Sequence, residues 1–120
     1  MIQASCHCGQ IKFSLPELPK TVTSCNCSAC SRFSALWAYF SPERIHFIAG
    51  KDKSKTYCWG DKTIAFHHCN NCGCITHYLP TASGNQNKMA VNFRLVDVKL
   101  LGSVKIKYFD GADSWQFIDQ

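Results

Sequence analysis

The densest group of reactive side chains is a set of three cysteines close together in the chain: Cys25, Cys27 and Cys30. In a C-x-C step both side chains can reach one ion, and the following x-x-C step turns a third sulfur toward it. Zinc binds Cys thiolates at about 2.3 Å in tetrahedral geometry, and three protein ligands with an open fourth position are typical of a catalytic site. The spacing therefore predicts a catalytic zinc site on these three residues.

Two further cysteine pairs lie on either side of this group, and each is followed directly by glycine. They are Cys6 with Cys8, and Cys69 with Cys72. Backbone amides turn toward the thiolates in metal-binding turns, and glycine tolerates the positive φ that this needs. Because four thiolates form a closed structural zinc site, we expect a second zinc on these four residues, where it would join distant parts of the chain.

The length and cysteine content of the chain limit its class. At 120 residues it is expected to form one domain, 1–120, which is small enough to gain from a structural metal. Residues 1–6 lack the basic and apolar regions of a signal peptide, and no stretch reaches the roughly 18 apolar residues of a membrane span. We therefore expect a cytoplasmic protein with no membrane partner. In that reducing compartment, the nine cysteines are expected to bind metal or do chemistry.

The basic charge balance is a weak guide to partners. The formal charge is +5, and seven thiolates with two Zn²⁺ ions would lower it by three, to about +2. The lysines alternate with other residues, as on solvated strand and turn faces. A zinc ribbon is disfavoured too, because its two C-x₂-C turns usually lie about 15 to 20 residues apart. We therefore expect no nucleic-acid partner.

The segments that must position the cysteines have the period of β-strands almost throughout. Residues 2–5 and 10–15 are predicted to form a hairpin around the first pair, and residues 21–23 a strand leading into the three-cysteine group. Ser28 is expected to cap one short helical turn that ends near Ala35. Further strands are expected at 36–40, 45–48, 55–59 and 63–68 with a hairpin turn between them, 75–79, 89–93 and 104–109. These segments predict an all-β fold of packed antiparallel sheets pinned by zinc.

Taken in order, the patterns C-x-C-G, C-x-C-x-x-C and C-x-x-C-G resemble those of the glutathione-dependent formaldehyde-activating enzyme family over nearly the whole chain. Arg32, residues 91–94 and residues 109–111 add to the resemblance. It implies a β-tent fold, a structural zinc on the four-cysteine set and a catalytic zinc on the three-cysteine set. The family reaction condenses formaldehyde with glutathione to S-(hydroxymethyl)glutathione and is classed as a carbon–sulfur lyase.

An open zinc site suits this chemistry, because it can bind a substrate thiol as thiolate beside an incoming carbonyl. Three thiolate ligands already donate much charge, which favours holding a nucleophile over strong Lewis acidity. Arg32 and Arg94 are the candidates to bind the carboxylates of glutathione or a similar thiol. We expect a zinc enzyme acting on a thiol–aldehyde adduct. The alternative is a zinc-stabilised binding module, or a metal or redox sensor, without catalysis.

Other cysteines and histidines are expected to have structural roles. Cys58 is predicted to lie in the core, and Cys74 to be a small buried side chain, with an extra thiol or alternative ligand as the other reading. Of His67 and His68, one is expected to face solvent and the other to pack near the zinc. The remaining histidines are expected to take no part in the sites: His7, His46 and His77.

Overall fold

The computed structural model describes residues 1–118, in which eleven strands form two sheets. This confirms the predicted all-β class. The smaller sheet has the order β1–β2–β5, and all its pairs are antiparallel. Its strands are β1 (Ile2–Ser5), β2 (Lys12–Leu15) and β5 (His46–Ala49).

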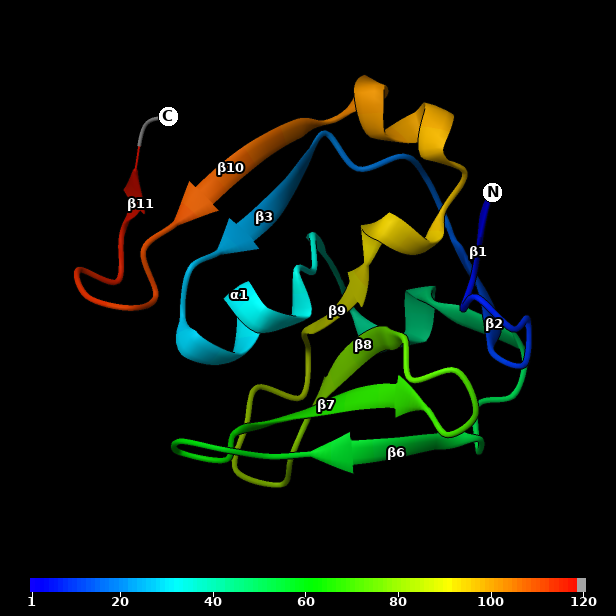
Figure 1. The fold of residues 1–120 in the computed structure, drawn as a ribbon, viewed down its shortest axis with the longest axis horizontal. Coiled ribbons are helices and arrows are strands. Elements are labelled where there is room, and N and C mark those ends of the chain that lie inside the picture. The colour runs from blue at the N-terminus through cyan, green and yellow to red at the C-terminus, as the bar shows by residue number, and fades with distance from the viewer. Residues whose placement is uncertain (119–120) are drawn as a thin grey trace.

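The larger sheet has eight strands and bends around the short helix α1 (Ser28–Phe33), so that β3 and β10 lie on one side of the helix and β6 and β7 on the other (Figure 1). Its order is β11 (Phe117–Ile118), β10 (Lys105–Phe109), β3 (Thr21–Cys25), β4 (Trp37–Phe40), β9 (Met89–Asn92), β8 (Ile75–Pro80), β7 (Ile64–Cys69) and β6 (Ser54–Tyr57). Three 3₁₀ helices connect strands: η1 (Pro42–Arg44), η2 (Phe93–Leu95) and η3 (Val98–Ser103).

One strand pair differs from the predicted antiparallel arrangement. Strand β10 runs parallel to β3, whereas the other pairs of the large sheet are antiparallel. Parallel neighbours need a long crossover connection, and six strands separate β3 from β10 in the chain. Strand periodicity alone carries no information on this direction.

The central strands of the large sheet are covered on both faces by apolar side chains. Along β4 and β9 successive side chains alternate between the faces. Ala38, Met89 and Val91 belong to the cluster shared with the small sheet, whereas Trp37 and Ala90 belong to the cluster beneath α1. All four residues of β9 are buried, as expected for a central strand with both faces covered.

The small sheet packs its apolar residues against the first of these clusters. Ile11, Phe13 and Leu15 are fully buried, as their alternation predicts. At the end of β5 the chain passes so close to the β1–β2 hairpin that a Cβ on Gly50, which has a φ of +73°, would lie 2.1 Å from the carbonyl oxygen of Gln10. Glycine is therefore required at this crossing.

Two local predictions are corrected by the structure. The cap of α1 is Cys27, not Ser28, because Cys27 has extended backbone and its sulfur accepts the N–H of Cys30. The strand predicted to run through Cys58 ends at Tyr57, where the edge strand β6 leaves its only partner, β7. Among the described residues, no helix has the length and apolar character needed to cross a membrane.

Candidate metal centres

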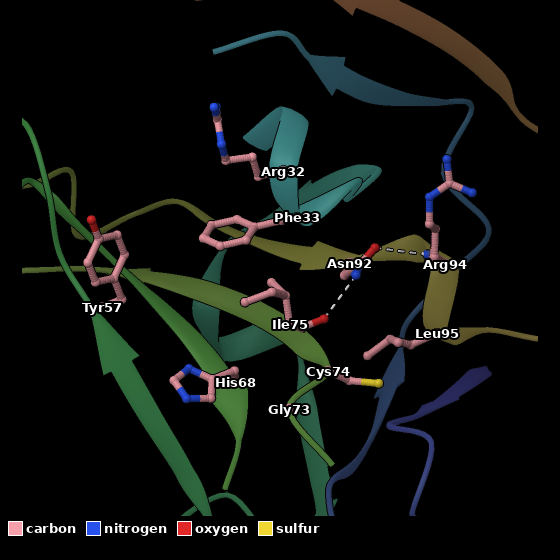
Figure 2. Close-up of a pocket in the computed structure, with 10 residues that line it drawn as sticks. All are labelled: Arg32, Phe33, Tyr57, His68, Gly73, Cys74, Ile75, Asn92, Arg94 and Leu95. Atoms are coloured by element: carbon pink, nitrogen blue, oxygen red, sulfur yellow. Dashed lines mark hydrogen bonds between the residues drawn. The ribbon is translucent and has the colours of Figure 1, made fainter. Parts of the chain in front are cut away.

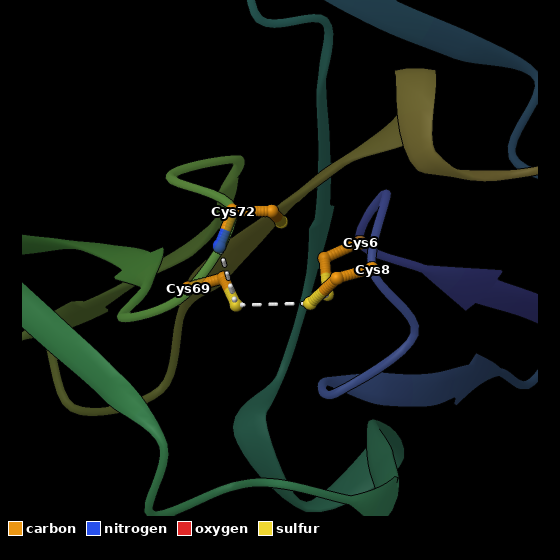
Figure 3. A group of neighbouring side chains, drawn as sticks. All are labelled: Cys6, Cys8, Cys69 and Cys72. Carbon is orange, nitrogen blue, oxygen red and sulfur yellow. Dashed lines mark hydrogen bonds between the residues drawn. The ribbon is translucent and has the colours of Figure 1, made fainter.

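Four cysteines from distant parts of the chain meet between the two sheets (Figure 3). Cys6 and Cys8 follow β1, whereas Cys69 ends β7 and Cys72 lies in the turn before β8. The four sulfurs lie within 4.8 Å of one another, with separations of 3.7 Å from Cys6 to Cys8 and 3.6 Å from Cys8 to Cys69. A tetrahedral ion with zinc–sulfur bonds of about 2.3 Å requires separations of about 3.8 Å. The donor set therefore fits zinc.

N–H groups surround these sulfurs and stabilise negative charge on them. The Ile11 amide donates to Cys6 Sγ at 3.3 Å. The Asn71 amide and the Gln10 side-chain amide both donate to Cys69 Sγ at 3.4 Å. Outer hydrogen bonds of this kind hold metal ligands in orientation. The fold thus positions the sulfurs as well as bringing them together.

The thiols of this group differ in pKa. Burial raises the pKa of Cys6 to about 11. Burial also acts on Cys72, but hydrogen bonds from the amides of Cys74 and Cys8 outweigh it and lower its pKa to about 5. Cys72 therefore ionises more readily than Cys6, and the positive charge of a bound metal would favour ionisation of the neighbouring thiols.

The three-cysteine group lies where β3 ends and α1 begins. The sulfurs of Cys25, Cys27 and Cys30 lie within 4.8 Å of one another. The Cys30 amide donates to Cys27 Sγ at 3.3 Å, and the indole Nε1 of Trp37 donates to Cys30 Sγ at 3.4 Å. Three sulfurs leave a tetrahedral ion one free position. The group can therefore hold a metal to which a further ligand can bind.

The thiols of this group also have unequal pKa values. Burial raises the pKa of both Cys25 and Cys30. Burial opposes ionisation of Cys27 too, but the Cys30 amide and neighbouring thiol hydrogen bonds lower its pKa overall. The sulfur that caps α1 is therefore the one that ionises most readily in this group.

Two tyrosines lie near the three-cysteine group on the same face of the large sheet. Tyr39 and Tyr78 both pair with Ala90 in register, from opposite sides of β9. The Tyr78 ring packs edge-on against Trp37 at 4.9 Å. Burial raises the pKa of both phenols, and charge on Cys30 raises it further. Both hydroxyls therefore stay protonated and can donate hydrogen bonds. Sequence reasoning missed this pair, because only strand pairing brings it together.

An open cavity of about 720 Å³ lies beside the C-terminal end of α1 (Figure 2). The cysteines of the three-cysteine group do not line it. This group begins at the other end of α1, whose six residues span about 9 Å. The cavity is lined by Arg32, Phe33, Tyr57, His68, Gly73, Cys74, Ile75, Asn92, Arg94 and Leu95.

The two arginines predicted to bind carboxylates both line this cavity, on α1 and η2 (Figure 2). Arg32 Nη1 donates to the carbonyl oxygen of Ser28 at 2.9 Å, and Arg94 Nε donates to the carbonyl oxygen of Ser34. A guanidinium has five N–H donors, so each retains donors for a ligand. The cavity can therefore accept an anionic group.

Comparison with known proteins identifies the family of this chain. The family model of the glutathione-dependent formaldehyde-activating enzyme matches residues 1–109, which include both cysteine groups. The chain belongs to this family. A crystal structure of a Rhodobacter sphaeroides protein is similar, with a TM-score of 0.70 and 25% sequence identity, over 88% of this chain and 99% of that chain. No curated protein matches the chain.

Two cysteines of this formaldehyde-activating family member lie outside the two groups. Cys58 is half-buried in the loop after β6 and joins neither apolar cluster, so its predicted place in the core is wrong. Its strand ends one residue earlier, at the edge of the sheet. Cys74 packs against the core but is only half-buried, and it lines the cavity.

The histidines of β7 and β8 differ in burial: His77 is buried, whereas His67 and His68 are half-buried. The Nδ1 of His67 and the Ser54 hydroxyl share a hydrogen bond of 2.8 Å, and the His67 ring stacks on the His77 ring at 4.3 Å. His68 faces the cavity (Figure 2). Burial lowers the pKa of His77 to about 3, so this ring is neutral. None of these residues belongs to a cysteine group.

Proposed function

We propose that the protein is a zinc-dependent enzyme that joins a thiol to an aldehyde, with glutathione and formaldehyde as the pair that the family name indicates. The observation that carries this proposal is the three-cysteine group. Its sulfurs lie within 4.8 Å of one another, and within residues 1–118 no fourth Cys, His, Asp or Glu completes the group. A substrate thiol can therefore be the fourth ligand.

The residues of this group have distinct parts in the proposed chemistry. Cys25, Cys27 and Cys30 would hold zinc, which when bound supplies a means of keeping a substrate thiol ionised at neutral pH. Trp37 orients Cys30 through its indole hydrogen bond. The four-cysteine group would hold a second zinc with a structural part, because it offers no free position.

The aldehyde oxygen also needs a partner as the reaction proceeds. The substrate sulfur forms a bond to the carbonyl carbon, the π-electron pair moves to oxygen, and the proton lost by the thiol ends on that oxygen. Tyr39 and Tyr78 are the hydroxyl donors near the group, and donors aimed at a developing oxyanion lower the barrier. The reverse reaction breaks the carbon–sulfur bond, as a carbon–sulfur lyase does.

The cavity supports an acidic thiol as the substrate. Arg32 and Arg94 present free N–H donors there, and guanidinium groups bind carboxylates well. A thiol whose carboxylates are held in the cavity would have to reach along α1 to the three-cysteine group. A tripeptide such as glutathione has carboxylates well separated from its sulfur, which suits this arrangement.

Exchange spectroscopy by NMR tests the proposed activity. Glutathione and formaldehyde react without a catalyst, so the quantity to compare is the exchange rate of the adduct with and without protein at equal substrate. We expect acceleration by the wild type and by Cys58→Ser, whose thiol lies outside both groups, but none by Cys27→Ser. If the wild type carries two zinc ions and gives no acceleration with any thiol and aldehyde tested, the protein is a binding or sensing module instead.

A further inference from the structure

The chain beyond β10 turns back onto the three-cysteine group. Asn26, which lies between the two cysteines of the C-x-C step, makes three hydrogen bonds to this segment. Its Nδ2 donates to Asp110 Oδ1 at 3.0 Å, and its Oδ1 accepts the Ala112 amide at 3.0 Å. Its backbone amide donates to the carbonyl oxygen of Phe109 at 3.2 Å. The loop that carries Cys25 and Cys27 is thus fastened to residues 109–112.

Asp110 is itself held by the residues that follow it. Its Oδ2 accepts the Ser114 amide at 3.1 Å and the Ser114 hydroxyl at 2.8 Å. Its amide donates to the carbonyl oxygen of Gln116 at 2.8 Å, and its carbonyl oxygen accepts the Trp115 amide at 2.7 Å. Every polar group of Asp110 therefore has a partner, and its side chain presents one oxygen to Asn26 in a defined direction.

Between these hydrogen bonds, Gly111 lies directly against the cysteines. A Cβ at this position would lie 2.7 Å from Cys25 Sγ and 3.3 Å from Cys27 Cβ. The first distance is too short for any Cβ, so the sulfur would have to rotate out of its place. The backbone of this turn therefore forms one wall of the three-cysteine group.

We propose that Asn26, Asp110, Gly111 and Ala112 form a clamp that positions the sulfurs of Cys25 and Cys27 for metal and closes this side of the group. Ligands held in place by surrounding contacts bind with less loss of conformational freedom. Asn26 is thus a positioning residue. The clamp would act whether or not the group is catalytic.

A charge exchange tests the hydrogen bond between Asn26 and Asp110. Asn26→Asp sets two carboxylates against each other, whereas the double variant with Asp110→Asn restores an amide–carboxylate pair with the roles reversed. In the zinc-loaded protein, iodoacetamide labelling is followed for each cysteine by mass spectrometry. We expect Cys25 and Cys27 to be labelled about tenfold faster in Asn26→Asp, the factor expected for one charge-assisted hydrogen bond, and near wild-type rates in the double variant.

A pair of glycine variants tests the wall. We expect Gly111→Ala to release about one zinc per chain to a chelator at least tenfold faster than the wild type, while its circular dichroism is unchanged. Gly102→Ala is the control, since a Cβ there meets nothing within 4 Å. Wild-type labelling and zinc-release rates in both Asn26→Asp and Gly111→Ala would overturn the clamp. If the labelling rate of Cys58 in Asn26→Asp rose over its wild-type rate by the same factor as those of Cys25 and Cys27, this would also overturn the clamp, because it would show general loosening.

Discussion

Loss of a single sulfur should have different consequences in the two cysteine groups. Cys72→Ser removes one ligand from a group that joins both sheets, whereas Cys27→Ser removes one from a group within a single short segment. Structural zinc supplies about 10 to 16 kcal/mol in small zinc peptides, against about 5 to 15 kcal/mol for a whole domain. We expect Cys72→Ser to be largely unfolded and Cys27→Ser to be folded and inactive, as measured by circular dichroism and zinc content. The reverse result would exchange the roles of the groups.

Tyr78 offers a test of the chemistry that leaves the metal in place. Its hydroxyl is proposed to donate to the aldehyde oxygen, and loss of one such donor costs about 10²- to 10³-fold where it is the main one. Because Tyr39 remains, we expect Tyr78→Phe to slow adduct exchange by about tenfold to a hundredfold with two zinc ions retained. Tyr108→Phe is the control. Thr23 shares a face with its partner Trp37, whereas Tyr108 pairs with the next residue, Ser24, and so points to the other face. Equal rates in both variants would refute the role.

The low pKa of buried His77 predicts a specific pH dependence of stability. Burial holds its folded-state pKa at about 3, below the usual value of about 6.5. The unfolded chain therefore binds a proton first as the pH falls, and stability is lost from about pH 6.5 downward at up to about 1.4 kcal/mol per pH unit. Between pH 6.5 and 5 we expect the free energy of unfolding of His77→Gln, measured in urea, to fall by about 1.5 kcal/mol less than that of the wild type. Parallel curves for wild type, His77→Gln and the exposed control His46→Gln would contradict this.

At the scale of elements, the end of β5 supports the turn that carries Cys6 and Cys8. Gly50 contacts the backbone of Gln10 and Ile11, and the Ile11 amide in turn donates to Cys6 Sγ. The crossing of β5 over the hairpin and the geometry of the metal turn are therefore linked. A side chain at this crossing would displace the strand and the turn together.

Gly50→Ala and Gly60→Ala form a matched pair for this crossing. Both glycines have positive φ, +73° and +64°, but only a Cβ at Gly50 meets backbone, at 2.1 Å from the Gln10 oxygen. The φ strain alone costs about 1 to 2 kcal/mol. We expect Gly60→Ala to lose that amount and Gly50→Ala to lose about 2 kcal/mol more, as measured by urea unfolding. Equal losses would show that the crossing relaxes freely.

At the scale of the molecule, the four-cysteine group connects the two sheets, since one pair follows β1 of the small sheet and the other flanks the turn from β7 to β8 of the large sheet (Figures 1 and 3). The three-cysteine group instead lies at one end of β3 within the large sheet. The two metals should therefore affect the molecule unequally. A metal on the four-cysteine group would join the two sheets, whereas one on the three-cysteine group would affect only a local site.

We expect two zinc ions per chain by elemental analysis of protein purified without chelator. Stepwise chelation should remove the zinc of the three-cysteine group first, with loss of activity and little change in fold. Removal of the second zinc should then raise hydrogen exchange in β1 and β2 before β8 and β9, because the small sheet loses its attachment. One zinc or none per chain, or unfolding at the first step, would contradict this order.

The sequence by itself determined which cysteines group together and most strands. Cys25, Cys27 and Cys30 lie so close together in the chain that their sulfurs can reach one point without help from distant segments. The alternation of Ile11, Phe13 and Leu15 likewise identifies a buried face, because side chains of a strand alternate whatever the sheet contains. The cysteine patterns also led to the family that the comparison confirms.

Tertiary structure alone decided what surrounds those sulfurs. Tyr78 comes near Cys30 only because β8, β9 and β4 pair in one register, and Asn26 meets Asp110 only because β10 returns beside β3. Cys58 misses the core because β6 is an edge strand. Such contacts depend on which distant strands become neighbours. Burial and hydrogen bonding across the whole chain decide that pairing. The local spacing of residues therefore does not predict which strands pair.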